Sequence, residues 1–97
     1  MKIEVLDDAE ADLIEGRDFY ERKAPGIGAY FATAIASDID SLILTAGIHP
    51  VHYGFYRLLS KRFPFGIYYG ITGDIIQIQA VLDLRREPAW IRERMRG

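Results

Sequence analysis

IIQIQAVLDLR, residues 75–85, is the stretch that decides the fold, because its apolar and polar side chains alternate with the two-residue period of a β-strand. One face of this strand carries the apolar side chains Ile76, Ile78, Ala80, Leu82 and Leu84. The other face carries the polar side chains Gln77, Gln79, Asp83 and Arg85. A strand with one apolar face is typical of an antiparallel sheet that packs on helices on one side and meets solvent on the other.

Two further strands precede this one and complete a three-stranded meander. Residues 55–60, FYRLLS, are rich in strand-forming side chains. The next segment alternates as well, with one face made of Phe65, Ile67, Tyr69 and Ile71. Thr72-Gly73-Asp74 predicts a hairpin turn, because Gly73 can adopt a positive φ. Pro64 has no backbone N–H to donate, so we expect it at the junction of two strands.

Two amphipathic helices come before the meander. The apolar stripe of the first consists of Ala9, Leu13, Gly16 and Tyr20, opposite the polar Glu10, Asp18, Glu21 and Arg22. The stripe of the second consists of Ile27, Phe31, Ala34, Ile35, Ile39, Leu42 and Ala46. Asp7 is placed to cap the first helix with its carboxylate. Ala24-Pro25-Gly26 separates the helices, and Gly47 with Pro50 ends the second.

The elements together predict one domain, residues 1–97, of the α+β class. Neither helix can bury its stripe on the other alone, so both need the sheet as a further layer. A short strand at Lys2–Leu6 and a basic tail helix that starts at Glu87-Pro88 complete the chain. The expected architecture is a helix hairpin packed on a small antiparallel β-sheet, with a short C-terminal helix.

Metal and cofactor sites are not expected. The chain has no cysteine, which excludes a disulfide framework and a thiolate metal site. His49 and His52 flank Pro50 without a carboxylate or thiolate ligand nearby in the sequence, so we expect no metal there. Gly26-Ile27-Gly28 lacks the preceding strand and the third glycine of a phosphate-binding loop.

The sequence also predicts a cytoplasmic location. Acidic Glu4 interrupts the N-terminal segment where a signal peptide needs apolar residues. The longest apolar run, residues 42–48, is far shorter than the ~20 residues that span a bilayer. We therefore expect no association with membranes.

Charge is distributed unevenly along the chain. Residues 1–48 carry four basic and ten acidic side chains, whereas residues 49–97 carry eight basic and four acidic ones, within a net charge of −2. Two ordinary solvated faces would account for this split. Alternatively, the second half meets an acidic partner.

Basic and aromatic side chains cluster in that second half. They are Arg57, Lys61, Arg62, Arg85, Arg86, Trp90 and Arg92. Protection of a sheet edge against aggregation accounts equally well for Lys61 and Arg62. Arg85 and Arg86 stand together at a strand end before a proline-started helix, which favours binding to nucleic acid or to an acidic protein segment.

Five strings, in this order, resemble the RelE/ParE family of toxins from type II toxin–antitoxin systems. They are Ala9–Leu13 through Phe19-Tyr20; Pro25–Gly28 followed by Phe31; His49-Pro50; Arg62–Phe65 with Ile67-Tyr68-Tyr69; and Ala80–Leu82 with Arg85–Pro88. The strings span nearly the whole chain. The resemblance implies the fold predicted above and a toxin that a cognate antitoxin neutralises.

The RelE branch of the family cuts messenger RNA on the ribosome with cationic side chains and no metal. The resemblance implies Arg57 and Arg86 (or its neighbour Arg85) as the catalytic groups if this chain is such a nuclease. However, Phe65 stands where that branch has a middle-strand arginine, and Leu59 leaves Arg57 without its basic partner. Loss of one charge-stabilising group commonly costs ~10²–10³ in rate.

The ParE branch poisons DNA gyrase instead, and the Phe63-Pro64-Phe65 motif is closer to that branch, although Asp83 stands where many of its members have histidine. We therefore expect a ParE-like toxin, with a ribosome-dependent endoribonuclease or a non-toxic member that only binds its antitoxin as alternatives. The expected binding residues are Arg57, Arg62, Arg85, Arg86 and Trp90, with Phe19 and Tyr20 contacting the antitoxin. Arg57, Arg85 and Arg86 would steer antitoxin carboxylates.

Overall fold

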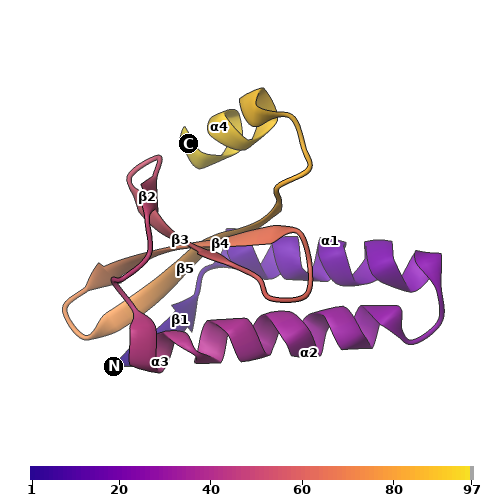
Figure 1. The fold of residues 1–97 in the computed structure, drawn as a ribbon, viewed down its shortest axis with the longest axis horizontal. Helices are drawn as coiled ribbons and strands as arrows, with labels where there is room; N and C mark the ends of the chain where they lie inside the picture. Colours follow the sequence, from indigo (N-terminus) through magenta and orange to yellow (C-terminus); the bar gives the residue numbers. More distant parts are fainter. Residues whose placement is uncertain (97) are drawn as a thin grey trace.

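The computed structural model describes residues 1–96 and shows a sheet with helices on both of its faces (Figure 1). Along the chain the elements are β1 (Lys2–Val5), α1 (Asp7–Lys23), α2 (Ile27–Asp40), α3 (Leu42–Thr45), β2 (Val51–His52), β3 (Phe55–Leu59), β4 (Phe65–Thr72), β5 (Ile75–Asp83) and α4 (Pro88–Arg96). The predicted α+β class, helix hairpin and C-terminal helix are confirmed.

The sheet has five strands in the order β1-β5-β4-β3-β2. The predicted meander is its antiparallel centre, β3 to β5, to which β2 adds a two-residue edge. β1 pairs with β5 in parallel, so the sheet is mixed rather than purely antiparallel as predicted. β1 begins beside the β4–β5 turn, where the Lys2 N–H donates to the Asp74 carbonyl, and it runs in the direction of β5 until α1 begins.

A β-bulge in β5 changes which side chains face the helices. Tyr69 pairs with Ile78 and Tyr68 with Ala80, so Gln79 is an extra residue without a partner on β4. The bulge reverses the alternation beyond it. The prediction of a single apolar face was therefore wrong.

The side chains of β5 consequently contribute to two hydrophobic cores, one on each face of the sheet. Before the bulge, Ile76 and Ile78 face the α1–α2 hairpin, and after it Val81 does. Ala80 and Leu82 face the opposite side, together with Tyr68 of β4. Strict alternation could not reveal this, since a bulge leaves the pattern of residue types unchanged.

The second face of the sheet is covered by α4 rather than by solvent (Figure 1). Ile91 is buried against Tyr68, Ala80 and Leu82, and Met95 packs beside it. The expectation of a solvent-facing sheet surface is thus corrected for the part that α4 covers. The tail helix supplies the apolar cover that Ala80 and Leu82 require once they point away from the hairpin.

The hairpin itself packs as its stripes predict. Ala9 and Gly16 of α1 are buried, and a Cβ atom at Gly16 would lie 2.7 Å from the ring of Phe31 on α2. The carboxylate of Glu21 accepts hydrogen bonds from the backbone N–H groups of Gly26 and Gly28, where α2 begins. Close approach of α1 and α2 therefore depends on glycine.

The predicted start of the first helix is wrong, whereas the predicted stop at Gly47 is confirmed. Leu6, not Asp7, is the N-cap of α1, and no side chain caps that end. Asp7 instead lies in the first turn, where its charge still favours the positive end of the helix. Gly47 adopts the left-handed conformation, with φ of 97°, as predicted for a helix stop.

By length and composition alone, Ile27–Thr45, which spans α2 and α3, is apolar enough to cross a membrane. The buried core helix of a soluble protein has the same length and composition. Phe31, Ile35, Ile39 and Leu42 of this segment belong to the main core.

Candidate protein-binding site

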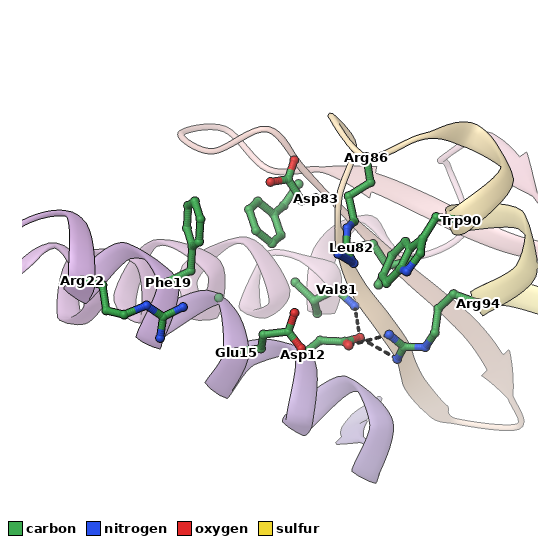
Figure 2. Close-up of a pocket in the computed structure, with 12 residues that line it drawn as sticks. Asp12, Glu15, Phe19, Arg22, Val81, Leu82, Asp83, Arg86, Trp90 and Arg94 are labelled. Carbon is green, nitrogen blue, oxygen red and sulfur yellow. Dashed lines mark hydrogen bonds and ion pairs between the residues drawn. The ribbon is translucent and has the colours of Figure 1, made fainter.

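A cavity of about 210 Å³ opens between α1, the end of β5 and α4, and we refer to it as the α1–α4 cavity (Figure 2). Its lining comprises Asp12, Glu15, Gly16, Phe19, Arg22, Phe65, Val81, Leu82, Asp83, Arg86, Trp90 and Arg94. The bulge determines its position, because it turns Val81 and Asp83 toward α1 while Leu82 points toward α4.

Two aromatic side chains form opposite walls of the cavity. Phe19 extends from α1 and Trp90 from α4, and these side chains are 37% and 38% exposed. Gly16 also lines the cavity, and its missing Cβ would point at Phe31 of α2. Large aromatic surfaces left partly exposed on either side of a cavity are typical of binding sites.

The inner end of the cavity is closed by an ion pair between the first and the last helix. Nη1 and Nη2 of Arg94 donate to the Asp12 carboxylate, at 2.6 and 2.8 Å, and the backbone N–H of Val81 donates to the same carboxylate at 3.0 Å (Figure 2). The hydrogen bond to Asp12 raises the pKa of Arg94. Asp12 therefore fixes α4 on α1 and satisfies a strand N–H beyond the end of β1.

A second ion pair lies at the outer rim. Arg85 donates to both carboxylate oxygens of Asp83, at 3.0 and 2.7 Å, and also to the Tyr20 hydroxyl at 3.4 Å. Burial alone would raise the pKa of Asp83, but the hydrogen bonds from Arg85 and the charges of Arg85 and Arg86 lower it below its usual value.

Arg85 was predicted to point away from the helix-packed core, and that prediction was wrong. It reaches back to Tyr20 on α1, because the bulge places Asp83 on the hairpin face.

Two cations at the cavity have no anionic partner among residues 1–96. The Arg86 guanidinium lies 3.7 Å from the ring centre of Trp90, and Arg22 projects from α1 on the other side. Lys23 adds a third positive charge, 4.9 Å from the Phe19 ring. With Asp12 and Asp83 neutralised by their arginines, Glu15 is the remaining acidic residue of the lining. The exposed part of the cavity is therefore both aromatic and cationic.

The structure gathers Phe19, Arg85, Arg86 and Trp90 of the predicted site residues here. Tyr20 lies behind them, packed on Phe31, Phe63 and Phe65, so its ring belongs mainly to the core. Burial raises the pKa of its hydroxyl, an effect that Arg85 reduces.

Arg57 and Arg62 lie elsewhere. Arg62 donates to the Tyr30 hydroxyl at 3.2 Å, near the turn that follows β3. Arg57 is half-buried on the α4 face, opposite Tyr68 in the register, and its Nε has no hydrogen-bond partner within residues 1–96. The predicted cationic residues thus do not form one continuous strip.

Asp12, Arg22 and Arg94 were missed by the sequence reasoning. Asp12 and Arg94 are 82 positions apart, and no local spacing relates them. Arg22 was assigned to the solvated face of the first helix. Arg22 follows Phe19 by three residues, so the two side chains lie on the same face of the helix. This spacing is the feature of the sequence that could have placed Arg22 in the site.

A second, more open cavity of about 560 Å³ lies between the β2–β3 turn, the bulge and α4. Tyr53, Gln79, Arg92 and Arg96 are among its lining residues. Tyr53 has a positive φ of 57°, which is uncommon for a residue other than glycine. The cationic tail helix therefore borders both cavities.

His49 has a structural partner. Its Nδ1 shares a hydrogen bond of 2.5 Å with the hydroxyl of buried Tyr69, which also accepts one from the backbone N–H of Gly47. Burial lowers the pKa of His49. No group of three or more potential metal ligands is present within residues 1–96.

No protein-family model and no curated protein matches the sequence. Among solved structures, the chain is similar to one described as "Chromosomal ParDE TA system from P. aeruginosa". The TM-score is 0.76, the identity is 24%, and the match covers 84% of this chain and 92% of the other. An identity at this level carries the fold alone. The chain therefore has the ParE-like fold that its sequence resemblance to the RelE/ParE family predicted.

Proposed function

We propose that this chain is the toxin of a type II toxin–antitoxin pair, of the ParE-like kind, and that a cognate antitoxin neutralises it. The observation that carries the proposal is the fold shared with a chain of a ParDE system over most of both lengths. The partly exposed aromatic and cationic α1–α4 cavity supports it, because an acidic protein segment would find complementary charge there.

The antitoxin, in this proposal, is a segment that folds as it binds and lies across α1 and the end of the sheet. Phe19, Trp90 and Arg86 provide the contact surface, and Arg85 contributes charge while remaining paired with Asp83. Such wrapping suits a small domain with few deep pockets. Arg57 and Arg62 would contact only a segment that extends well beyond the cavity.

The proposed target is DNA gyrase, and the proposed location is the cytoplasm. Phe65, which occupies the position of an arginine in the nuclease branch, is 6% exposed and packs on Phe31. It is thus a core residue, and its side chain has neither a charge nor a donor with which to bind phosphate. This supports the proposal of a toxin that acts by binding its target.

One observation favours the endoribonuclease as a second candidate. The Arg57 guanidinium lies beside the Tyr68 hydroxyl, whose pKa is raised by burial and partly lowered again by Arg57. A cation with an unused N–H next to a phenol is a combination that phosphoryl-transfer sites employ. α4 packs on Tyr68, however, so a substrate would have to displace that helix.

The test combines three measurements. The gene is induced alone and together with its neighbouring reading frame, and growth arrest rescued by the neighbour is expected. Purified protein should inhibit DNA supercoiling by gyrase and leave messenger RNA intact in a translating ribosome assay. Cleavage at defined codons that disappears in Arg57→Ala would replace the gyrase proposal by the nuclease. Absence of growth arrest, with tight binding to the neighbour, would identify a non-toxic member.

A further inference from the structure

We infer that the α1–α4 cavity is an anchor site for a single aromatic side chain that has a carboxylate close to it, presented by the antitoxin segment. The inference rests on the proposed function, since it specifies what the partner carries. It follows from the size of the cavity, the nature of its walls and the charges at its mouth.

The size of the cavity matches one ring-bearing side chain. A dry cavity of about 150 Å³ accommodates benzene, so about 210 Å³ leaves room for a phenol or an indole. The walls suit the same occupant. An aromatic ring inserted there would meet the Phe19 ring on one side and, on the other, the Arg86 guanidinium that lies over the Trp90 ring. Both kinds of contact stabilise beyond the area they bury.

The charges decide which polar group accompanies the ring. Arg86 and Arg22 are at the mouth without an anionic partner among residues 1–96, and Lys23 stands over Phe19. Glu15 is the one acidic lining residue that no arginine neutralises. The balance at the mouth is therefore positive, so a carboxylate beside the ring is attracted and an ammonium group is repelled.

The cavity is also built to keep its shape. Asp12 holds Arg94 with two hydrogen bonds, and its side chain is only 10% exposed. Ile91 fixes the same helix on the sheet. The position of Trp90 relative to Phe19 is thus set before any partner arrives, which reduces the entropy that binding must overcome.

A small-molecule probe tests the cavity without an antitoxin. Indole-3-acetate carries the ring and the carboxylate, and tryptamine carries the same ring with an ammonium group. Titration of each into isotope-labelled protein is followed by the NMR signal of the indole N–H of Trp90, which is unambiguous because the chain has one tryptophan. We expect indole-3-acetate to shift this signal with a dissociation constant on the order of 1 mM. Tryptamine should bind roughly fivefold more weakly.

The antitoxin arm uses the product of the neighbouring reading frame and isothermal titration calorimetry. Phe19→Ala and Trp90→Ala should each weaken its binding about 30-fold, as expected for anchor residues. Arg22→Ala should weaken it several-fold. Two controls are matched: Arg17→Ala removes an exposed arginine of the same helix, and Leu44→Ala removes an exposed apolar side chain outside the cavity. Neither control should change the affinity, and circular dichroism verifies that each variant is folded.

The two failures are distinguishable. If the neighbour binds the wild type but the Phe19 and Trp90 variants retain full affinity, the anchor inference is overturned and the proposed function stands. Equal binding of both probes, or none, overturns it as well. If the wild type does not bind the neighbour at all, the proposed function falls, and the inference about its partner falls with it.

Discussion

Replacement of Asp12 by alanine removes the carboxylate that joins α1, β5 and α4. Three hydrogen bonds disappear together: two from Arg94 and one from the backbone N–H of Val81. The Asp12 side chain is 10% exposed and the Arg94 side chain 25% exposed, so most of this pair is shielded from water. The substitution therefore leaves the Val81 N–H without its acceptor and the Arg94 guanidinium with the Asp8 carbonyl at 3.4 Å.

The loss of stability can be worked from these contacts. Breaking a fully buried ion pair costs about 3–5 kcal/mol, and an unsatisfied buried donor costs about 1–3 kcal/mol. Arg94 keeps a quarter of its surface in water and can turn outward, which reduces the first contribution. We expect Asp12→Ala to lower the free energy of unfolding by about 2–4 kcal/mol in total. Asp12→Asn, which retains an acceptor for Val81, should lose about half as much.

Urea denaturation measures this loss, and Trp90 fluorescence reports on the docking of α4. The midpoint should fall by ~2 M for Asp12→Ala. Asp18→Ala is the matched control, because Asp18 lies on the same helix in an exposed pair with Arg17; its midpoint should stay at the wild-type value. A loss below about 1 kcal/mol for Asp12→Ala would refute the reasoning, since it would mean that α4 does not depend on this pair.

Three further predictions concern the core and the turn after α3. Leu82→Ala should lower the free energy of unfolding by about 2–5 kcal/mol, because Leu82 is 2% exposed between the sheet and α4; thermal denaturation against exposed Leu44→Ala as a control checks this. Gly16→Ala should cost about 1–3 kcal/mol, since the new Cβ would press on the Phe31 ring, and an unchanged melting temperature would contradict the close packing. The folded state has a lowered pKa for His49, so the stability that neutral His49 contributes is complete above the unfolded pKa of about 6.5 and is lost as pH falls through the folded pKa. His49→Ala should remove this part of the pH dependence of the free energy of unfolding. An unaltered pH profile in the variant would contradict the role of His49.

The sequence predicts the fold class correctly, but it does not predict which helices cover which face of the sheet. Helical stripes such as Ala9 and Gly16 are local patterns, and the hairpin packs as they predict. The cover that α4 gives to the second face could not be anticipated, because the alternation in residues 75–85 assigned Ala80 and Leu82 to the hairpin side. Only the pairing with β4 reveals that Gln79 is extra.

The candidate site was found in part. Arg86 and Trp90 follow one another closely in the sequence, so their spacing alone predicts that they cluster. Arg22 and Asp12 became part of the site only through the packing of α1 against the end of β5, which no short-range spacing encodes. Arg57 was grouped with the others on charge alone, and the register with Tyr68 places it on another face.

The bulge at Gln79 also determines how this strand can change in length during evolution. Deleting Gln79 would join Ile78 directly to Ala80, and every other side chain of β5 would keep the face it has now. Deleting Ile78 or Ala80 would also remove the bulge, but it would place the polar Gln79 side chain at a core position. Loss of residue 79 is thus the change in strand length that disturbs the fold least. A relative without this residue would form the same two cores from a β5 that is one residue shorter.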